Sequence, residues 1–307
     1  MIPFGVKELA QITGGKNLSI VASQFHNIGT DTRVSLKGQA FFALKGDAFD
    51  AHAFLPQAVA QGAAVLVVHD EKLVTEKLKS QISVVLVSDT LIALQDLSQF
   101  YRKQMQAKVV GITGSNGKTT TKEFTAAIME PYKKVHYNKG SFNNHWGVPF
   151  TLLAIEPQHE IAIVEMGMNH AGELTTLAKI ATPDVVVVTT VGRAHMEAFG
   201  TLEKIAEAKN EIYSASPADS TRIYNLDNPE CRKFFAEAKK LYPKAKIISF
   251  GQASEADVSL QLVSMDLRSL TLRGRIGAAT HRVTVPVFGA QNVTNLMAAC
   301  SLGLAIG

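Results

Sequence analysis

Residues 109–120 read Val109-Val110-Gly111-Ile112-Thr113-Gly114-Ser115-Asn116-Gly117-Lys118-Thr119-Thr120. An apolar, β-branched run thus leads directly into a glycine-rich turn, and a helix-compatible segment begins at Thr121. A strand, loop and helix in this order can bind phosphate, because glycines let backbone N–H groups turn toward phosphate oxygens and the helix directs its positive dipole end at them. The segment therefore predicts a nucleotide-binding site.

The polar side chains of this loop suit a nucleoside triphosphate. Lys118 can supply a mobile cation to the outer phosphates, and the Thr119 hydroxyl can ligate Mg²⁺. We therefore assign to cofactor binding Gly114, Ser115, Asn116, Gly117, Lys118, Thr119 and Thr120. The usual pattern has glycine at the place of Ile112, so the alternative is a plain glycine turn with a solvated lysine. Residues 138–141 lack the aspartate of a guanine reader, which favours adenine.

The segments around the loop predict a P-loop-type, doubly wound and mostly parallel α/β domain. Helical stretches separate four apolar, β-branched runs, as a parallel sheet covered on both faces requires. These runs are residues 109–113, 161–166, 185–191 and 221–226. Polar and apolar residues then alternate in 258–265, 269–276 and 282–287, which predicts added antiparallel strands. Residues 291–306 are expected to form a final helix.

The first 84 residues predict a separate small α/β domain, since short apolar runs alternate there with one helix-like segment. Residues 90–106 carry apolar side chains at helical spacing. We therefore expect an N-terminal domain at 1–84, a linker helix at 85–107 and a central domain at 108–307. A chain of 307 residues agrees with two domains at roughly 150 residues each.

Charge and hydropathy exclude several classes of protein. The 31 Lys and Arg against 27 Asp and Glu leave a net charge of +4, without the dense positive stripe of a nucleic-acid-binding protein. No apolar run approaches the roughly 20 residues that cross a membrane, and no leader-like segment opens the chain. With two cysteines and no C-x-x-C spacing, we expect a cytoplasmic protein that binds neither nucleic acid nor membrane.

Polar residues after the neighbouring strands are candidates for the rest of the site, because doubly wound sheets bind ligands beyond the carboxyl ends of their strands. Glu165 ends one apolar run, and His195 follows another. A carboxylate and a neutral imidazole can hold a divalent cation, although Mg²⁺ prefers oxygen ligands. The alternatives are a surface or helix-dipole carboxylate for Glu165 and a structural histidine for His195.

Lys209 interrupts an apolar stripe. In the helix expected at 202–215, Leu202, Ile205 and Ile212 form the stripe, and Lys209 occupies a position where another apolar residue would fit. Its side chain either snorkels to water or is functional. Desolvation lowers the pKa of a lysine, and a neutral amine can add CO₂ to become a metal-binding carbamate.

Two asparagines open the final helix. Asn292 and Asn295 lie one helical turn apart, so both can face an adenine edge. The alternative is that Asn292 only caps the helix.

Six segments occur in a fixed order along the chain. They are residues 113–120, Asn138 to Asn144 leading to Gly147-Val148-Pro149, Glu165-Met166-Gly167-Met168-Asn169, residues 192–200, Ala208-Lys209-Asn210-Glu211-Ile212 and Asn225-Leu226-Asp227-Asn228-Pro229. This series resembles the Mur ligase family, the ATP-dependent enzymes that build the peptide stem of bacterial peptidoglycan. Asp31-Thr32-Arg33, residues 41–46 and His52 are most similar to the branch that adds D-alanyl-D-alanine.

The resemblance implies an ATP-dependent amide ligase of peptidoglycan synthesis. It would join D-alanyl-D-alanine to UDP-N-acetylmuramoyl-tripeptide through an acyl phosphate, with ATP and Mg²⁺ as cofactors, and we expect a monomer. Family members carry a third, C-terminal domain, and this chain ends where that domain would begin. The resemblance therefore predicts an incomplete enzyme that turns over poorly.

The resemblance also implies a role for each candidate residue. The phosphate loop would hold the ATP phosphates, and Asn292 and Asn295 would lie near the adenine. Thr119, Glu165, His195 and a carbamylated Lys209 would surround the magnesium. With Lys118, the last three would form the catalytic set. Residues Thr30, Asp31, Thr32, Arg33, Lys45 and Gly46 would belong to the pocket for the UDP end of the substrate.

Three rival interpretations stay open at this point. A sister ligase that adds the third stem residue shares the core motifs, and a metabolite kinase shares the phosphate loop. A non-catalytic module would only bind the nucleotide or the UDP sugar. The presence of Lys118, Glu165, His195 and Lys209 argues against the last interpretation.

Overall fold

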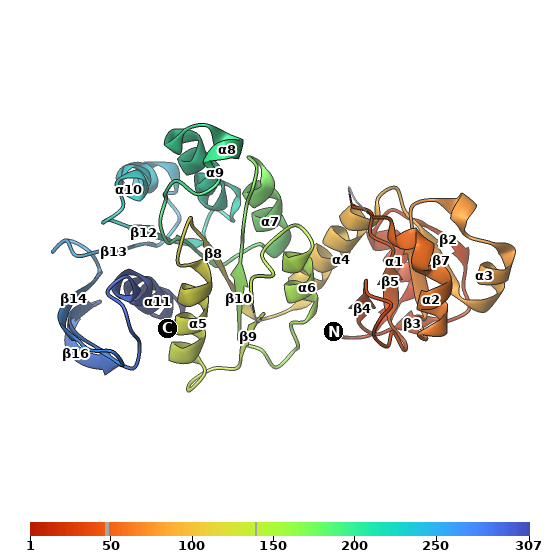
Figure 1. The fold of residues 1–307 in the computed structure, drawn as a ribbon, viewed down its shortest axis with the longest axis horizontal. Coiled ribbons are helices and arrows are strands. Elements are labelled where there is room, and N and C mark those ends of the chain that lie inside the picture. Colours follow the sequence, from red (N-terminus) through yellow and green to blue (C-terminus); the bar gives the residue numbers. More distant parts are fainter. Residues whose placement is uncertain (47–48, 139) are drawn as a thin grey trace. The chain divides into compact units, whose positions relative to one another are not determined.

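A computed structural model describes residues 1–46, 49–138 and 140–307 of the protein (Figure 1). The chain divides into two compact units. The first comprises Met1–Met105 with Leu152–Glu156, and the second comprises Gln106–Thr151 with Pro157–Gly307. No helix among the residues that the structure describes is long and apolar enough to cross a membrane.

The first unit is built on a five-stranded sheet of order β2-β7-β6-β5-β4, with a separate antiparallel pair of β1 and β3. Its strands are β1 (Phe4–Gly5), β2 (Lys16–Ser19), β3 (Gln24–Phe25), β4 (Ile28–Gly29), β5 (Ala40–Phe42), β6 (Val65–Val68) and β7 (Ser83–Leu86). Its helices are α1 (Val6–Ile12), α2 (Leu55–Ala60), α3 (Glu76–Gln81) and α4 (Thr90–Gln104), with 3-10 turns at Ala51–Phe54 and Glu71–Leu73.

Sequence explains the central elements of this unit. All four residues of β6, Val-Leu-Val-Val, are buried, because its parallel neighbours β5 and β7 and the covering helices exclude water from both faces. Helix α4 begins after Asp89, whose carboxylate accepts hydrogen bonds from Leu91 N and Ile92 N. This helix belongs to the first unit.

The second unit contains a nine-stranded sheet of order β16-β15-β14-β13-β12-β11-β8-β10-β9. Its strands are β8 (Lys108–Thr113), β9 (Val135–Tyr137), β10 (Ile161–Glu165), β11 (Val185–Val188), β12 (Thr221–Asn225), β13 (Ile247–Phe250), β14 (Val258–Met265), β15 (Leu270–Ile276) and β16 (Ala279–Val285). Pairing is parallel from β9 to β14 and antiparallel from β14 to β16. The predicted fold class is confirmed.

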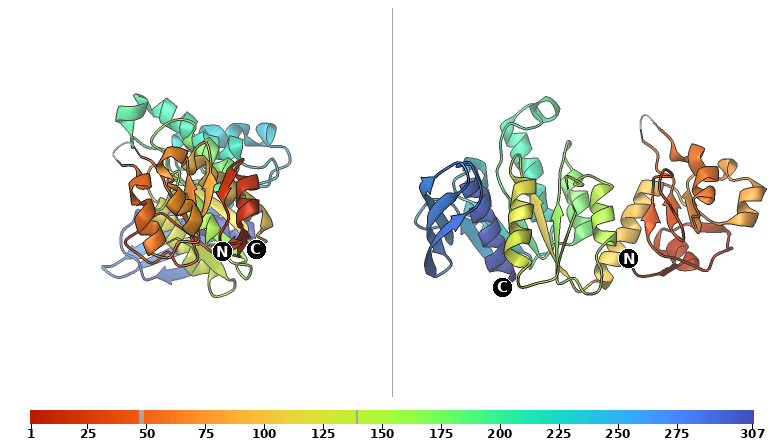
Figure 2. Two further views of the ribbon diagram at one scale, coloured as in Figure 1. Left: turned by 90° about the vertical axis from the view of Figure 1, so that its right-hand side faces the viewer. Right: turned by 60° about the horizontal axis from the view of Figure 1, so that its bottom comes forward.

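Helices cover both faces of this sheet. Those that contact its strands are α5 (Lys118–Met129), α7 (Glu173–Ala181), α9 (Leu202–Ala215), α10 (Pro229–Leu241) and α11 (Asn292–Ile306). The short helix α8 (Met196–Phe199) packs on α9, and α6 (Gly147–Leu153) ends within the segment assigned to the first unit. Helices α5 and α11 pack side by side on one face, where Ile223 of β12 joins their apolar cluster (Figure 2). The next residue, Tyr224, points to the other face and stacks on Tyr213 of α9 at 4.5 Å between ring centres.

The order of the strands decides where a ligand can bind. Strand β8 lies between β11 and β10, and all three run parallel, so the loops at their carboxyl ends meet at one edge. The phosphate loop follows β8, Glu165 ends β10, and the segment with His195 follows β11. The sheet therefore gathers the candidate residues from three distant parts of the sequence.

Arg222 fixes the end of the helix that carries Lys209. Only 1% of this residue is exposed, and its guanidinium donates to the carbonyls of Tyr213 (2.9 Å), Ser220 (2.8 Å) and Pro217 (3.1 Å). The guanidinium also lies 3.8 Å from the ring centre of Tyr242. Tyr213 lies in the last turn of α9, and Pro217 and Ser220 follow the helix; backbone acceptors at a helix end have no partner inside the helix.

We predict that Arg222→Met lowers the free energy of unfolding by about 2–4 kcal/mol, because buried carbonyls lose their donors. Urea denaturation of the two proteins measures the difference. Arg268→Met, at an exposed position of the same unit, serves as the control and should change stability by less than about 0.5 kcal/mol. Equal effects of the two substitutions would contradict this account of α9.

Candidate nucleotide-binding site

The phosphate-loop glycines are required by the turn that joins β8 to α5. Gly114 (φ +151°) and Gly117 (φ +82°) adopt backbone angles that residues with a Cβ rarely adopt. A Cβ on Gly117 would collide with Asn295 Oδ1 of α11, and one on Gly114 would collide with the Thr189 hydroxyl. The loop keeps this shape only with glycine at both positions.

Polar contacts hold the loop against the segment that follows β11. Ser115 N donates to Thr190 O (2.8 Å), and the Ser115 hydroxyl donates to Gly192 O (3.0 Å) and accepts from Gly192 N (2.8 Å). The Thr189 hydroxyl donates to Asn116 O (2.6 Å). These polar groups are therefore already hydrogen-bonded within the protein. The first backbone N–H groups of α5 are the donors that a phosphate would contact.

Lys118 lies over the loop. Its Nζ donates to Gly114 O at 2.9 Å. Burial lowers the pKa of Lys118, and the negative charge of Glu165 opposes this shift. An anion placed beside the loop would replace the carbonyl as the partner of this cation.

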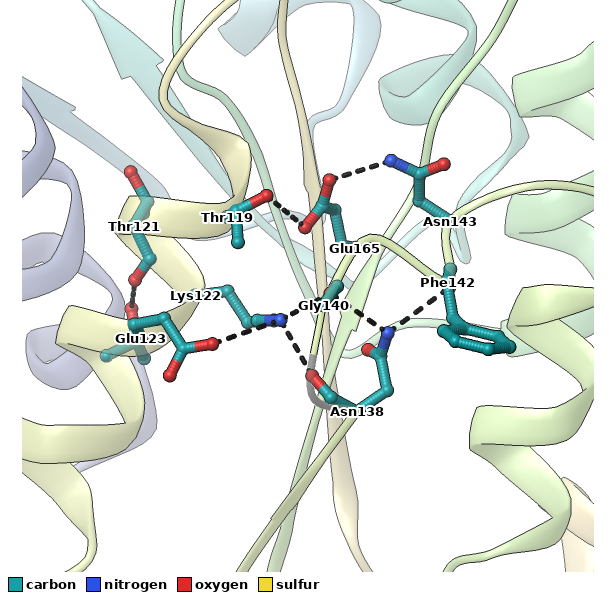
Figure 3. A network of polar contacts seen from close by, with 10 residues as sticks. Thr119, Thr121, Lys122, Glu123, Asn138, Gly140, Phe142, Asn143 and Glu165 are labelled. Atoms are coloured by element: carbon teal, nitrogen blue, oxygen red, sulfur yellow. Dashed lines mark hydrogen bonds and ion pairs between the residues drawn. The ribbon is translucent and has the colours of Figure 1, made fainter.

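Glu165 is a buried carboxylate held from both sides (Figure 3). Only 1% of the residue is exposed. Its Oε2 accepts from the Thr119 hydroxyl (2.9 Å), and its Oε1 accepts from Asn143 Nδ2 (2.7 Å). The two donors come from α5 and from the segment before α6, so the carboxylate has a fixed orientation.

Lys209 lies on the buried face of α9. With 2% of the residue exposed, its side chain does not snorkel to water. Burial, followed by the positive charge of Lys118, lowers the pKa of Lys209 to about 7. A large fraction of this amine is therefore neutral at neutral pH.

His195 occupies the position before α8 in a left-handed backbone conformation (φ +65°). Burial lowers the pKa of His195, and the charges of Lys209 and Lys118 lower it further, against a smaller opposing effect of Glu173. The imidazole is therefore neutral near pH 7, which is the form that binds metal ions.

The structure thus brings the predicted catalytic residues together in the second unit. The charge of Lys118 lowers the pKa of Lys209, the charges of both lysines lower the pKa of His195, and Lys118 also interacts with Glu165. The Thr119 hydroxyl and the Glu165 carboxylate are oxygen donors in direct contact, which is the chemistry that Mg²⁺ prefers. The buried Glu165 carboxylate beside the Thr119 hydroxyl therefore fits a divalent cation.

A cavity of about 730 Å³ opens beside the loop and the start of α11. Asn292 Nδ2 donates to Phe288 O (2.8 Å), and Asn295 Nδ2 donates to Asn292 Oδ1 (3.2 Å). The residue before the helix is Gln291, and Asn292 is the first helical residue, so the capping alternative for Asn292 is wrong. The lining residues are Asn116, Gly117, Thr120, Phe124, Thr190, Val287, Phe288, Gln291, Asn292, Thr294 and Asn295.

The residues expected at a UDP pocket belong to the first unit. Thr30 to Arg33 follow β4, and Lys45 and Gly46 follow β5, at the carboxyl ends of two neighbouring parallel strands. Arg33 Nη2 donates to Asp31 Oδ2 at 2.7 Å, and this hydrogen bond lowers the pKa of Asp31 to about 2. The Thr32 hydroxyl donates to Gln57 Oε1 (3.2 Å).

Several site residues were not predicted from the sequence. Lys122 is buried one turn after Thr119, and it belongs to a buried stripe of α5 with Thr125 and Met129. The stripe argument that selected Lys209 would have found it. Phe288 and Gln291 line the cavity from a loop, where no periodicity marks them. Lys139, in the segment quoted above, lies outside the described residues.

Comparison with protein families identifies the chain. The model of the Mur ligase middle domain matches residues 112–303, and the model described as Mur ligase family, catalytic domain, matches residues 24–109. The chain therefore belongs to the Mur ligase family.

Individual relatives agree with this assignment. The UDP-N-acetylmuramoyl-tripeptide–D-alanyl-D-alanine ligase of Bacillus subtilis is 37% identical over 311 residues, which cover 100% of this chain and 65% of that enzyme. A crystal structure of MurF from Acinetobacter baumannii gives a TM-score of 0.90 at 34% identity, covering 100% of this chain and 66% of that one. The chain thus spans about 65% of the length of such relatives.

A further solved structure contains a nucleotide. The MurF ligase of Thermotoga maritima, crystallised in complex with ADP, matches 92% of this chain and 63% of that chain, with a TM-score of 0.79 at 26% identity.

The shifted pKa of Lys209 predicts a pH-dependent effect of Lys209→Met on stability. The folded protein holds this proton with a pKa of about 7 against 10.5 for an ordinary lysine, so between these values the unfolded chain binds more protons. The wild-type protein therefore loses stability relative to the variant as the pH falls from 10.5 to 7. Urea denaturation at pH 6.5 and 9.5, in CO₂-free buffer, should show Lys209→Met relatively more stable at pH 6.5.

The control for this experiment is Lys204→Met, an exposed lysine on the same helix. Its stability relative to the wild type should stay constant between the two pH values. If the stability difference between Lys209→Met and the wild type is also the same at both pH values, the Lys209 amine is charged throughout this range.

Proposed function

We propose that the protein is an ATP-dependent ligase of peptidoglycan synthesis that joins D-alanyl-D-alanine to UDP-N-acetylmuramoyl-tripeptide. The observation that carries this proposal is the gathering of a phosphate loop, a buried carboxylate and two lysines at one edge of the sheet. The similarity to UDP-N-acetylmuramoyl-tripeptide–D-alanyl-D-alanine ligases along the whole chain supports the choice of substrates. The chain spans about 65% of the length of these relatives. The activity of the whole protein is therefore part of the proposal.

The nucleotide of the proposed reaction is ATP. The loop from Gly114 to Thr120 holds its phosphates, and Lys118 exchanges its bond to Gly114 O for a bond to the outer phosphates. The adenosine occupies the cavity beside α11, where Asn292 and Asn295 offer amide groups to the base. The complex of the Thermotoga MurF ligase with ADP supports this assignment.

Magnesium is the second proposed cofactor. Thr119, Glu165, His195 and Lys209 in its carbamylated form would hold it, and the bound ion would neutralise charge on the phosphates. Lys209 suits carbamylation because CO₂ adds only to a neutral amine, and the lowered pKa of Lys209 provides that form. The nitrogen of the neutral amine forms a bond to the carbon of CO₂ and releases a proton, so the product is a carbamate anion that no longer repels Lys118.

The reaction brings two negatively charged groups together. The peptide carboxylate forms a bond to the γ-phosphorus while the bond to ADP breaks, which gives an acyl phosphate. The amine of D-alanyl-D-alanine then attacks the acyl carbon, loses a proton and releases phosphate as the amide forms. Lys118 lowers the barrier to the first step, because its positive charge stabilises the transferring phosphoryl group inside a water-poor site.

The UDP end of the substrate is assigned to the first unit. Thr30 to Arg33 and Lys45-Gly46 follow neighbouring parallel strands, and ligands of such sheets bind beyond their carboxyl ends. Arg33 is exposed and already oriented by Asp31, so its guanidinium can contact a diphosphate.

Product analysis tests the proposed reaction. The complete protein that carries these residues, given ATP, Mg²⁺, UDP-N-acetylmuramoyl-tripeptide and D-alanyl-D-alanine, should release ADP, phosphate and the amide product in equal amounts. A product only from UDP-N-acetylmuramoyl-dipeptide and a diamino acid would identify the sister ligase instead. A phosphorylated substrate without amide would identify a kinase, and no turnover of either pair would leave a binding module.

The nucleotide site can be tested in the 307-residue chain itself. Gly117→Ala should weaken ADP binding by about tenfold or more in calorimetry, because the added methyl collides with Asn295 at the loop.

Gly172→Ala is a matched control for this substitution. Gly172 also precedes a helix with a positive φ (+88°), but a Cβ there meets no atom within 4 Å. Both variants carry a similar backbone strain of about 1–2 kcal/mol, and only Gly117→Ala should lose affinity for ADP. Unchanged ADP affinity in Gly117→Ala would remove this loop from the nucleotide site.

A further inference from the structure

Lys122 is a fully buried cation that the proposed reaction does not use. Its side chain is 0% exposed, and Nζ donates to Asn138 O (2.7 Å) and to Gly140 O (2.8 Å). The third contact of Nζ is an ion pair with Glu123 Oε1 at 3.3 Å. The ammonium group therefore makes two hydrogen bonds to carbonyls and one ion pair with a carboxylate.

The two carbonyls belong to the segment that leads to Asn143 (Figure 3). Asn138 Nδ2 closes this segment internally by donating to Gly140 O (3.3 Å) and Phe142 O (3.5 Å). Asn143 then donates to Glu165 Oε1, while its own carbonyl accepts from Gly167 N (2.7 Å). The segment between β9 and α6 thus connects Lys122 to the buried carboxylate.

Lys122 and Thr119 are three residues apart on α5, so they lie on the same side of the helix. Thr119 binds one oxygen of Glu165 directly. Lys122 acts on the other oxygen through the segment that carries Asn143. One turn of α5 therefore controls both sides of the carboxylate.

The use of a lysine here is costly unless its charge is needed. Burying an ammonium group requires strong compensation, and an apolar side chain of similar length would fill the same volume without that cost. Among the described residues, the carbonyls of Asn138 and Gly140 accept from no backbone N–H of a strand or helix, and an ammonium group can donate to both at once. Lys122 therefore adds two hydrogen bonds to those that Asn138 Nδ2 makes within the segment.

We propose that Lys122 is a positioning residue of the ligase site: its contacts to Asn138 O and Gly140 O fix the segment that carries Asn143, and Asn143 in turn fixes the Glu165 carboxylate for the metal–nucleotide complex. The proposal rests on the proposed function for the role of Glu165. The ordering of the segment itself does not depend on that function.

The chain contains a reporter for this segment. Trp146 is its one tryptophan, it is 38% exposed, and its ring meets Phe142 edge-on at 6.2 Å between ring centres. Quenching of Trp146 fluorescence by acrylamide therefore measures how well the segment is ordered, without nucleotide or metal.

Lys122→Met is the central variant. We expect the acrylamide quenching constant of Trp146 to rise at least about twofold, because Asn138 O and Gly140 O both lose their hydrogen bond from Lys122. We also expect the Mg²⁺ concentration for half-maximal enhancement of ADP binding to rise about tenfold, with ADP affinity in the absence of Mg²⁺ unchanged within about twofold. Lys122→Arg keeps the positive charge and the hydrogen-bond donors. Its quenching constant and its Mg²⁺ requirement should therefore lie between those of the wild type and those of Lys122→Met.

Two controls separate this role from a general loss of stability. Lys133→Met removes a partly exposed lysine of the same unit, which pairs with Glu160, and should change neither measurement. Asn143→Ala keeps the contacts of Lys122, so Trp146 quenching should stay near the wild-type value. It removes the hydrogen bond to Glu165, so the Mg²⁺ requirement should rise. If Lys122→Met does not fold, as judged by circular dichroism, Lys122→Arg and Asn143→Ala still test the proposal.

The outcomes distinguish the two proposals. Wild-type quenching in Lys122→Met, or an unchanged Mg²⁺ requirement in Asn143→Ala, would overturn the positioning role. Failure of the wild-type chain to bind ADP would overturn the proposed function. In that case increased quenching in Lys122→Met would still support the ordering of the segment by this lysine.

Discussion

The site depends on one buried carboxylate. Glu165 ends a strand inside the sheet, has 1% of its surface exposed, and is held by a hydroxyl on one oxygen and an amide on the other. A carboxylate in such surroundings carries a large desolvation cost that neutral donors offset only in part. The cost falls when a cation is bound, so the apo site favours the binding of positive charge. This constraint links the loop, α5 and the segment before α6.

Positive charge is crowded on the other side of the same site. Burial lowers the pKa of both lysines, and the positive charge of Lys118 lowers the pKa of Lys209 further. His195 is kept neutral for the same reasons. Phosphates would relieve the repulsion at Lys118, and a carbamate would remove it at Lys209. The buried positive charges of Lys118 and Lys209 are therefore unfavourable in the free protein, and the proposed phosphates and carbamate would compensate them.

Much of the fold could be predicted from the sequence, because buried parallel strands must be apolar on both faces and β8, β10 and β11 show this directly. Strand β9 (Val135–Tyr137) was missed, since it has three half-buried residues, and β16 begins at Ala279 rather than at residue 282. Strand order and side-chain direction depend on tertiary packing. The clamp of Asn143 on Glu165 and the burial of Lys122 therefore became visible only in the structure.

The most direct test of the central claim is a crystal structure of the chain with ADP and Mn²⁺ in place of Mg²⁺. The account predicts an anomalous manganese peak within about 2.0–2.3 Å of the Thr119 hydroxyl or the Glu165 carboxylate, with the phosphates seated on the loop around Lys118. ADP bound with its phosphates away from this loop, or a metal ion that contacts neither Thr119 nor Glu165, would contradict it.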